Sequence, residues 1–196
     1  MIAVIDYKAG NLTSVIKGLA HLHADAVVTA DPDVVRRAAK IVLPGVGHFA
    51  ATTLLKETGL TEAVRDRATA GVPFLGICVG LQWLFEGSTE APGASGLGAF
   101  AGMCQRFDDG LKVPHVGWNS VALKPGSRLM AGVEEGAFVY YTHSYRAPLD
   151  QDTVAVTTYG EPFTGAVERG NVMGVQFHPE KSGAVGMRVL ANFVGL

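Results

Sequence analysis

The segment at residues 73–82 constrains the fold most, because an apolar run leads into a cysteine set between two glycines, PFLGICVGLQ. This pattern is typical of a strand that turns sharply into a helix. Such a turn crowds the positions two before and two after the turn residue, so Gly76 and Gly80 would avoid a collision and expose Cys78. Helix N-termini favour a thiolate. Cys78 is therefore a candidate nucleophile, although G-x-C-x-G alone also fits a buried core cysteine.

A second motif, His-Pro-Glu at residues 178–180, follows another apolar run, VMGVQF. In an extended segment, residues two apart point to the same side, so His178 and Glu180 are expected to project into one site. A cysteine nucleophile needs a base, and the base needs a group that orients it. Cys78, His178 and Glu180 are therefore predicted to form a catalytic triad. His178 alone would equally fit a strand-end histidine bonded to a carbonyl.

Strand and helix signals alternate in the first half of the chain, which predicts an α/β fold with an open, mostly parallel twisted sheet flanked by helices. Strands are expected at 1–6, at 26–29, at 40–43 and directly before Cys78. Helices are expected at 12–22 and 61–70, in a segment that begins at Pro32 with Asp31 as its N-cap, in a segment that ends at Leu55, and in a segment after Cys78 that ends at Phe85. An additional β-rich region follows, with strands at 100–106, 117–123, 137–145, 153–159, 163–168 and 172–177 and a closing helix at 182–193. Because one domain spans roughly 100 to 200 residues, residues 1–196 are predicted to form a single domain.

Composition argues against several classes of protein. The net charge is −2 with no basic stripe, so neither nucleic acid nor a membrane surface is expected as a partner. No apolar run approaches the ~20 residues of a membrane span. The N-terminus has no basic lead and is interpreted as a first strand, so a cytoplasmic location is expected. Cys104 is interpreted as a small core residue, and no metal or cofactor is expected because no close zinc-ligand spacing occurs.

Two more segments could contribute to a site. Residues 41–47, IVLPGVG, end a strand in a glycine-rich turn, and ligands of open α/β sheets bind beyond the carboxyl ends of strands. Backbone N–H groups there could face a reacting carbonyl, or the segment could be an ordinary tight turn. Residues 140–146, YYTHSYR, form a polar strand end. They fit a substrate-binding role and a half-exposed strand with aromatic cross-strand pairs about equally well.

Several motifs together resemble a known family. GICVGLQ at 76–82, HPE at 178–180 and PGVG at 44–47 resemble the class I glutamine amidotransferases, whose Cys, His and Glu hydrolyse glutamine to glutamate and ammonia. Within this class, the chain resembles the glutaminase subunits of imidazole glycerol phosphate synthase through DY at 6–7, GNL at 10–12, KVPHVGWN at 112–119, THSY at 142–145 and EKS at 180–182. Val79, Leu81 and Trp83 are conservative departures from the usual Leu, Met and Leu.

The resemblance implies a thioester on Cys78, with His178 passing a proton to the leaving ammonia. It implies that the N–H groups of Val46 and Val79 bind the oxyanion. It also implies that the amino-acid end of glutamine is held, partly through backbone groups, by Gly47, Gln82, His143, Ser144 and Tyr145. We also expect that rotation of the Gly45–Val46 peptide, which glycine makes sterically cheap, switches the activity.

The resemblance further implies a (β/α)8 cyclase partner, in a 1:1 heterodimer, that receives the ammonia through a channel for imidazole glycerol phosphate synthesis in histidine biosynthesis. The interface candidates are Asn11, Trp118, Tyr140 and Lys181, although each also fits simple packing or a solvated charge.

Other interpretations stay open. A glutaminase subunit of another synthase, such as pyridoxal phosphate synthase, would be favoured by a P-G-G-E-S turn, which this chain lacks. A γ-glutamyl hydrolase or cysteine peptidase of related fold would need an open cleft and no obligate partner. A non-catalytic binding module is disfavoured because Cys78, His178 and Glu180 are all present.

Overall fold

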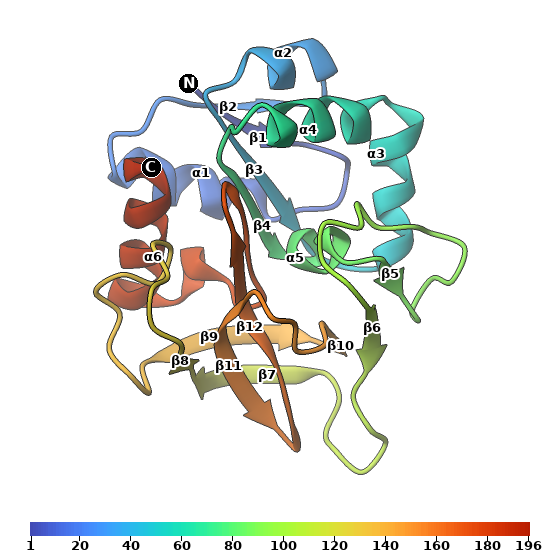
Figure 1. The fold of residues 1–196 in the computed structure, drawn as a ribbon, viewed down its shortest axis with the longest axis vertical. Coiled ribbons are helices and arrows are strands. Elements are labelled where there is room, and N and C mark those ends of the chain that lie inside the picture. Colours follow the sequence, from blue (N-terminus) through green and yellow to red (C-terminus); the bar gives the residue numbers. More distant parts are fainter.

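The computed structural model describes residues 1–196, and its centre is an eight-stranded sheet in the order β2-β1-β3-β4-β13-β12-β11-β8 (Figure 1). Five neighbouring strands are parallel: β2 (Ala26–Thr29), β1 (Ile2–Ile5), β3 (Lys40–Gly45), β4 (Phe74–Cys78) and β13 (Val172–Val175). The antiparallel strands are β12 (Glu161–Arg169), β11 (Thr153–Tyr159) and β8 (Ala122–Leu123). The sheet is therefore mixed, with the predicted parallel part on one side.

Helices cover both faces of the sheet. Figure 1 shows α1 and α6 on one side and α2 to α5 on the other. The α-helices are α1 (Leu12–His21), α2 (Pro32–Arg37), α3 (Thr53–Glu57), α4 (Leu60–Thr69), α5 (Val79–Leu84) and α6 (Gly183–Gly195), and the 3-10 helices are η1 (Phe49–Thr52) and η2 (Pro179–Lys181). Asp31 caps α2 as predicted, because its side chain accepts a hydrogen bond from the Asp33 N–H. The predicted α/β class is confirmed.

Smaller elements complete the second half of the chain. β5 (Gly87–Ser88), β6 (Met103–Arg106) and β10 (Tyr145–Arg146) form a three-stranded sheet, and β7 (His115–Ser120) pairs antiparallel with β9 (Phe138–His143). The expected strand at 137–145 breaks at Ser144, and the one at 117–123 breaks at Val121. These breaks separate the β7–β9 ribbon from its neighbours.

The parallel strands bring four chain segments to one edge of the sheet. Tyr7, Val46, Val79 and Gln176 lie one or two residues after the carboxyl ends of β1, β3, β4 and β13. Ligands of such sheets bind beyond this edge. The end of β9 reaches the same place, since the Cys78 Sγ lies 4.0 Å from the carbonyl oxygen of Thr142.

One apolar core underlies both halves of the chain. A connected cluster of 47 buried apolar residues includes members of the parallel strands and of the later β-rich segments. Cys104 belongs to this cluster and is fully buried, as predicted, and burial raises the pKa of its thiol. None of the helices combines the length and hydrophobicity that crossing a membrane requires.

Candidate active site

The predicted sharp turn from a strand into a helix, called the elbow below, is present at the junction of β4 and α5. Cys78 ends the strand with a φ of 56°, and α5 begins at the next residue. A Cβ added at Gly76 would lie 2.4 Å from the carbonyl oxygen of Gly80, and one at Gly80 would lie 2.0 Å from the carbonyl oxygen of Leu43. Both positions therefore require glycine. A positive φ at a residue with a side chain costs roughly 1–3 kcal/mol and is typical of functional sites.

His178 and Glu180 form a buried pair. The His178 Nδ1 lies 2.9 Å from the Glu180 Oε1, and the two side chains are 2% and 1% exposed. The local geometry differs from the expected extended segment, because Pro179 begins a 3-10 turn. This turn brings Glu180 back toward the imidazole. The pairing was predicted correctly, but from the wrong backbone conformation.

The electrostatics of this pair suit a catalytic base. Burial lowers the pKa of His178, but the neighbouring Cys78 sulfur and Glu180 outweigh burial and raise it to about 10. Because Glu180 engages Nδ1, the other ring nitrogen is the one that can exchange a proton. This Nε2 atom is buried and has no hydrogen-bond partner. This nitrogen is therefore free to exchange a proton with a ligand in the site.

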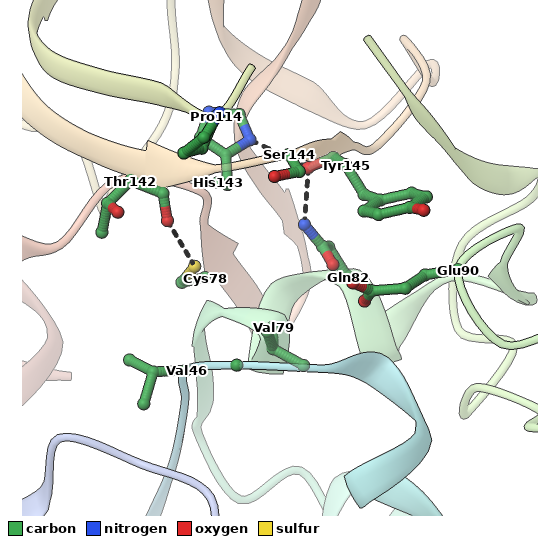
Figure 2. Close-up of a pocket in the computed structure, with 11 residues that line it drawn as sticks. Val46, Cys78, Val79, Gln82, Glu90, Pro114, Thr142, His143, Ser144 and Tyr145 are labelled. Atoms are coloured by element: carbon green, nitrogen blue, oxygen red, sulfur yellow. Dashed lines mark hydrogen bonds between the residues drawn. The ribbon is translucent and has the colours of Figure 1, made fainter.

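Cys78 opens into a cavity of about 240 Å³ at the carboxyl edge of the sheet (Figure 2). Every residue predicted to bind glutamine or the oxyanion lines this cavity, whereas His178 and Glu180 do not. The lining residues are Val46, Gly47, Cys78, Val79, Gln82, Glu90, Pro114, Thr142, His143, Ser144 and Tyr145. The fold thus brings together segments that are far apart in the sequence.

The glycine-rich turn after β3 lies beside the elbow. The Val46 N–H has no acceptor within the protein, so it is available to a ligand. A Cβ at Gly45 would lie 2.6 Å from the Tyr7 Oη and 2.7 Å from the Val79 Cβ. Gly45 is therefore needed for close packing, and the rotation of the Gly45–Val46 peptide stays a prediction. The residue of this turn with a positive φ, 89°, is Gly47.

Sequence reasoning missed Glu90, the one carboxylate in the cavity lining. Its Oε2 accepts a hydrogen bond from the Phe49 N–H at 2.7 Å, which fixes the side chain at the cavity wall. The residue lies in a polar loop after β5, and no local pattern distinguishes it from other surface acids. Only the folded chain places it opposite Cys78, as Figure 2 shows.

The ring of His143 is engaged within the protein. Its Nδ1 lies 2.8 Å from the carbonyl oxygen of Tyr145, which can only accept, so Nδ1 carries the proton. Its Nε2 then accepts from the His115 Nδ1 at 3.0 Å, and the His115 Nε2 accepts from Asn119 at 3.3 Å. Both ring nitrogens of His143 are thus engaged, so its predicted role in holding glutamine would use its backbone groups.

The two buried histidines predict a loss of stability in mild acid. Burial lowers the pKa of His143 to about 3 and that of His115 to about 4, below the usual 6.5. Their contribution to stability is present above pH 6.5 and is lost as the pH falls toward 4, because the unfolded chain binds protons first. The His115→Phe variant should show a shallower decline of the free energy of unfolding over this range, measured by urea titration. A variant of the exposed His21, His21→Phe, should keep the wild-type slope, and an equal slope for His115→Phe would contradict the assignment.

Three of the four interface candidates gather on one face. Trp118 is 56% exposed, and its ring lies 6.1 Å from that of Tyr140 in an edge-on arrangement. The Lys181 Nζ lies 5.8 Å from the centre of the same tyrosine ring. Asn11 stands at the start of α1, where its side chain makes no capping hydrogen bond.

Comparisons with known proteins identify the family of the chain. The family model for glutamine amidotransferase class-I matches residues 3–195. The chain is 49% identical to "Imidazole glycerol phosphate synthase subunit HisH" of Thermococcus kodakarensis, covering 98% of both proteins. It is 46% identical to the protein of the same name from Methanothermobacter thermautotrophicus, covering 99% of this chain and 98% of the relative.

Solved structures show the same fold at lower sequence identity. A structure titled "Crystal structure of glutamine amidotransferase" matches with a TM-score of 0.78 and 17% identity, covering 100% of both chains. "Structure of PurLQS from Thermotoga maritima" also matches with a TM-score of 0.78 and 17% identity, covering 99% of this chain and 97% of the other. The chain belongs to the class I glutamine amidotransferases and, within them, to the HisH subunits of imidazole glycerol phosphate synthase.

Proposed function

We propose that the chain hydrolyses glutamine to glutamate and ammonia and supplies the ammonia to a cyclase subunit for imidazole glycerol phosphate synthesis in histidine biosynthesis. The observation that carries this proposal is the convergence of an elbow cysteine with the buried His178–Glu180 pair beside a small polar cavity. A nucleophile, a base and an orienting carboxylate are the groups that acyl transfer needs.

In the proposed reaction, the Cys78 sulfur attacks the carboxamide carbon of glutamine and forms a C–S bond. The N–H groups of Val46 and Val79 bind the oxygen that becomes negatively charged. His178 then gives its Nε2 proton to the leaving nitrogen, and ammonia departs as the C–N bond breaks. Water, activated by the neutral imidazole, attacks the thioester and releases glutamate and Cys78.

The cavity suggests how glutamine is oriented. If the carboxamide lies against Cys78, the other end of the molecule lies toward Glu90 on the far side of the cavity (Figure 2). The Glu90 carboxylate is suited to the α-ammonium group by charge. Gly47, Gln82, Ser144 and Tyr145 line the space between them and are proposed to bind the remaining polar groups.

Ammonia released into water would be protonated and lost as a nucleophile, so the proposed partner is a (β/α)8 cyclase that forms a 1:1 complex and receives ammonia through a channel. We propose that it docks on the outer face of the β7–β9 ribbon. Val116 and Phe138 are 56% and 59% exposed there, next to Trp118 and Tyr140, and exposed apolar patches mark interaction sites. The Tyr140 carbonyl accepts a hydrogen bond from the His178 N–H at 2.9 Å. Docking of the partner on this face would therefore contact β9, the strand to which His178 is hydrogen-bonded.

Trp118→Ala is expected to weaken binding of the cyclase subunit by roughly 30-fold or more, because large aromatic side chains at interface centres are worth about 2 kcal/mol or more. Isothermal titration with purified cyclase measures the effect. Leu149→Ala, which truncates an exposed leucine outside the β7–β9 ribbon, is the control and should bind like wild type. An unchanged affinity for Trp118→Ala would remove this face from the interface.

The function itself is tested by mixing the chain with a cyclase subunit and its nucleotide substrate. Glutamine should support imidazole glycerol phosphate formation, with one glutamate released for each product formed. Glutamate release without that product, or production of pyridoxal phosphate with the corresponding synthase, would assign the chain to another synthase. Hydrolysis of γ-glutamyl peptides in place of glutamine would identify a hydrolase.

A further inference from the structure

Gln176, the residue directly after β13, lies against the nucleophile. It is fully buried, and its Nε2 lies 3.7 Å from the Cys78 Sγ. Its backbone N–H donates to the carbonyl oxygen of Gly165 at 2.8 Å. The residue is therefore anchored to the neighbouring strand while its side chain reaches the sulfur. A buried amide beside a reactive sulfur calls for a chemical explanation.

The hydrogen-bond network determines which end of this amide faces the sulfur. The Gln82 side chain lies 2.7 Å from the carbonyl oxygen of Tyr145. Because a backbone carbonyl only accepts, this end of Gln82 must be its amino group. The same amino group lies 3.2 Å from one end of the Gln176 amide, which must then be its oxygen. The amino group of Gln176 is consequently the end that points at Cys78.

Besides His178, two further neighbours of the sulfur suit different protonation states. The carbonyl oxygen of Thr142, 4.0 Å from Sγ, can accept a hydrogen bond from a neutral thiol. The amino group of Gln176 can only donate, so it interacts best with a negatively charged sulfur. Hydrogen bonds to a charged group are roughly twice as strong as neutral ones. The contact from Gln176 is therefore most favourable when Cys78 is a thiolate, before attack and again when the sulfur leaves the thioester.

We propose that Gln176 is a further residue of the catalytic machinery, which donates a hydrogen bond to the Cys78 thiolate and holds the sulfur toward the cavity. Gln82 acts as a positioning residue, because it fixes the orientation of the Gln176 amide. Its two amide protons are used by Tyr145 and Gln176, so only its oxygen remains to contact a substrate. This inference rests on the glutaminase function proposed above. No bond of Gln176 is made or broken in the reaction.

The test is the Gln176→Met variant, which keeps the length of the side chain but removes its donor and acceptor. In the complex with the cyclase subunit, kcat for glutamine hydrolysis should fall roughly 10- to 100-fold, the range for loss of a hydrogen bond to a charged group, with KM little changed. Without glutamine, the ultraviolet absorbance of the thiolate should decrease, and iodoacetamide should alkylate Cys78 more slowly. Cys104 does not interfere because it is fully buried. Gln151→Met, the same change in an exposed turn, should match wild type in all three measurements.

A second variant, Gln176→Glu, keeps both the size of the side chain and an acceptor for Gln82. Its carboxylate would repel the thiolate, so its kcat should fall further than that of Gln176→Met. Circular dichroism checks the fold of each variant, and if Gln176→Met does not fold, Gln176→Glu decides the question. Wild-type turnover and alkylation rates in a folded variant would overturn the proposal. The alkylation and absorbance measurements need no glutamine, so a wild-type protein that fails to hydrolyse glutamine would refute the proposed function without deciding the role of Gln176.

Discussion

Replacing Cys78 by alanine is expected to abolish glutamine hydrolysis and leave the ammonia-dependent reaction of the complex largely intact. The thioester route requires sulfur at this position, and no other nucleophilic side chain of comparable reactivity lines the cavity. Ammonia supplied from solution bypasses the glutaminase step and needs only the cyclase. The measurement is imidazole glycerol phosphate formation by the complex, with glutamine and with ammonium salt as alternative nitrogen donors.

Cys104→Ala is the matched control for this experiment, because it removes the other cysteine of the chain. Its sulfur is buried in the apolar core and does not line the cavity. The variant should keep its glutamine-dependent activity, although truncation of a core side chain lowers stability somewhat. Glutamine hydrolysis near the wild-type rate in Cys78→Ala would show that Cys78 is not the nucleophile.

Glu180→Gln should reduce glutaminase turnover by roughly four orders of magnitude, the loss seen when the orienting carboxylate of a serine-protease triad is replaced by an amide. Glu180 holds the His178 Nδ1 at 2.9 Å and helps to raise the pKa of the imidazole. An amide in its place can donate to Nδ1 and stabilise the wrong tautomer. It also removes the negative charge that favours the imidazolium, so the pKa of His178 should fall.

Steady-state kinetics in the complex separates this effect from substrate binding, because KM for glutamine should change far less than kcat. NMR titration of the His178 ring checks the direction of the pKa change. Glu134→Gln, at an exposed carboxylate, provides the control and should behave like wild type. Normal turnover in Glu180→Gln would assign Glu180 a structural role and show that His178 does not need this carboxylate for catalysis.

The elbow could be predicted from the sequence because its requirements are local. The spacing of Gly76 and Gly80 around Cys78 follows from contacts within one strand–turn–helix unit, and the structure shows both contacts. The alternation of apolar runs likewise predicted the parallel strands and the helices between them. The pairing of His178 with Glu180 was also predicted, since two residues so close in sequence can meet in either an extended segment or a 3-10 turn.

Other parts of the site depend on where distant segments meet, which no local pattern records. Glu90 resembles any surface acid until the loop after β5 places it at the cavity wall. Gln176 lies in an apolar run, and no sequence pattern predicts a role for it. The pairing of β13 with β4 in the folded chain brings it to Cys78. The engagement of His143 by His115 requires the register of the β7–β9 ribbon, in which these two residues are partners. Side-chain burial and strand register decide these roles, and both are properties of the folded chain.

During turnover, Cys78 is expected to carry the acyl group of glutamine. Rapid acid quenching of the complex during glutamine hydrolysis, followed by mass spectrometry of its peptides, can detect this intermediate. The peptide that contains Cys78 should carry a glutamyl adduct in the wild-type protein. Steady glutamate production with no adduct on Cys78, or with an adduct on another residue, would show that Cys78 is not the nucleophile.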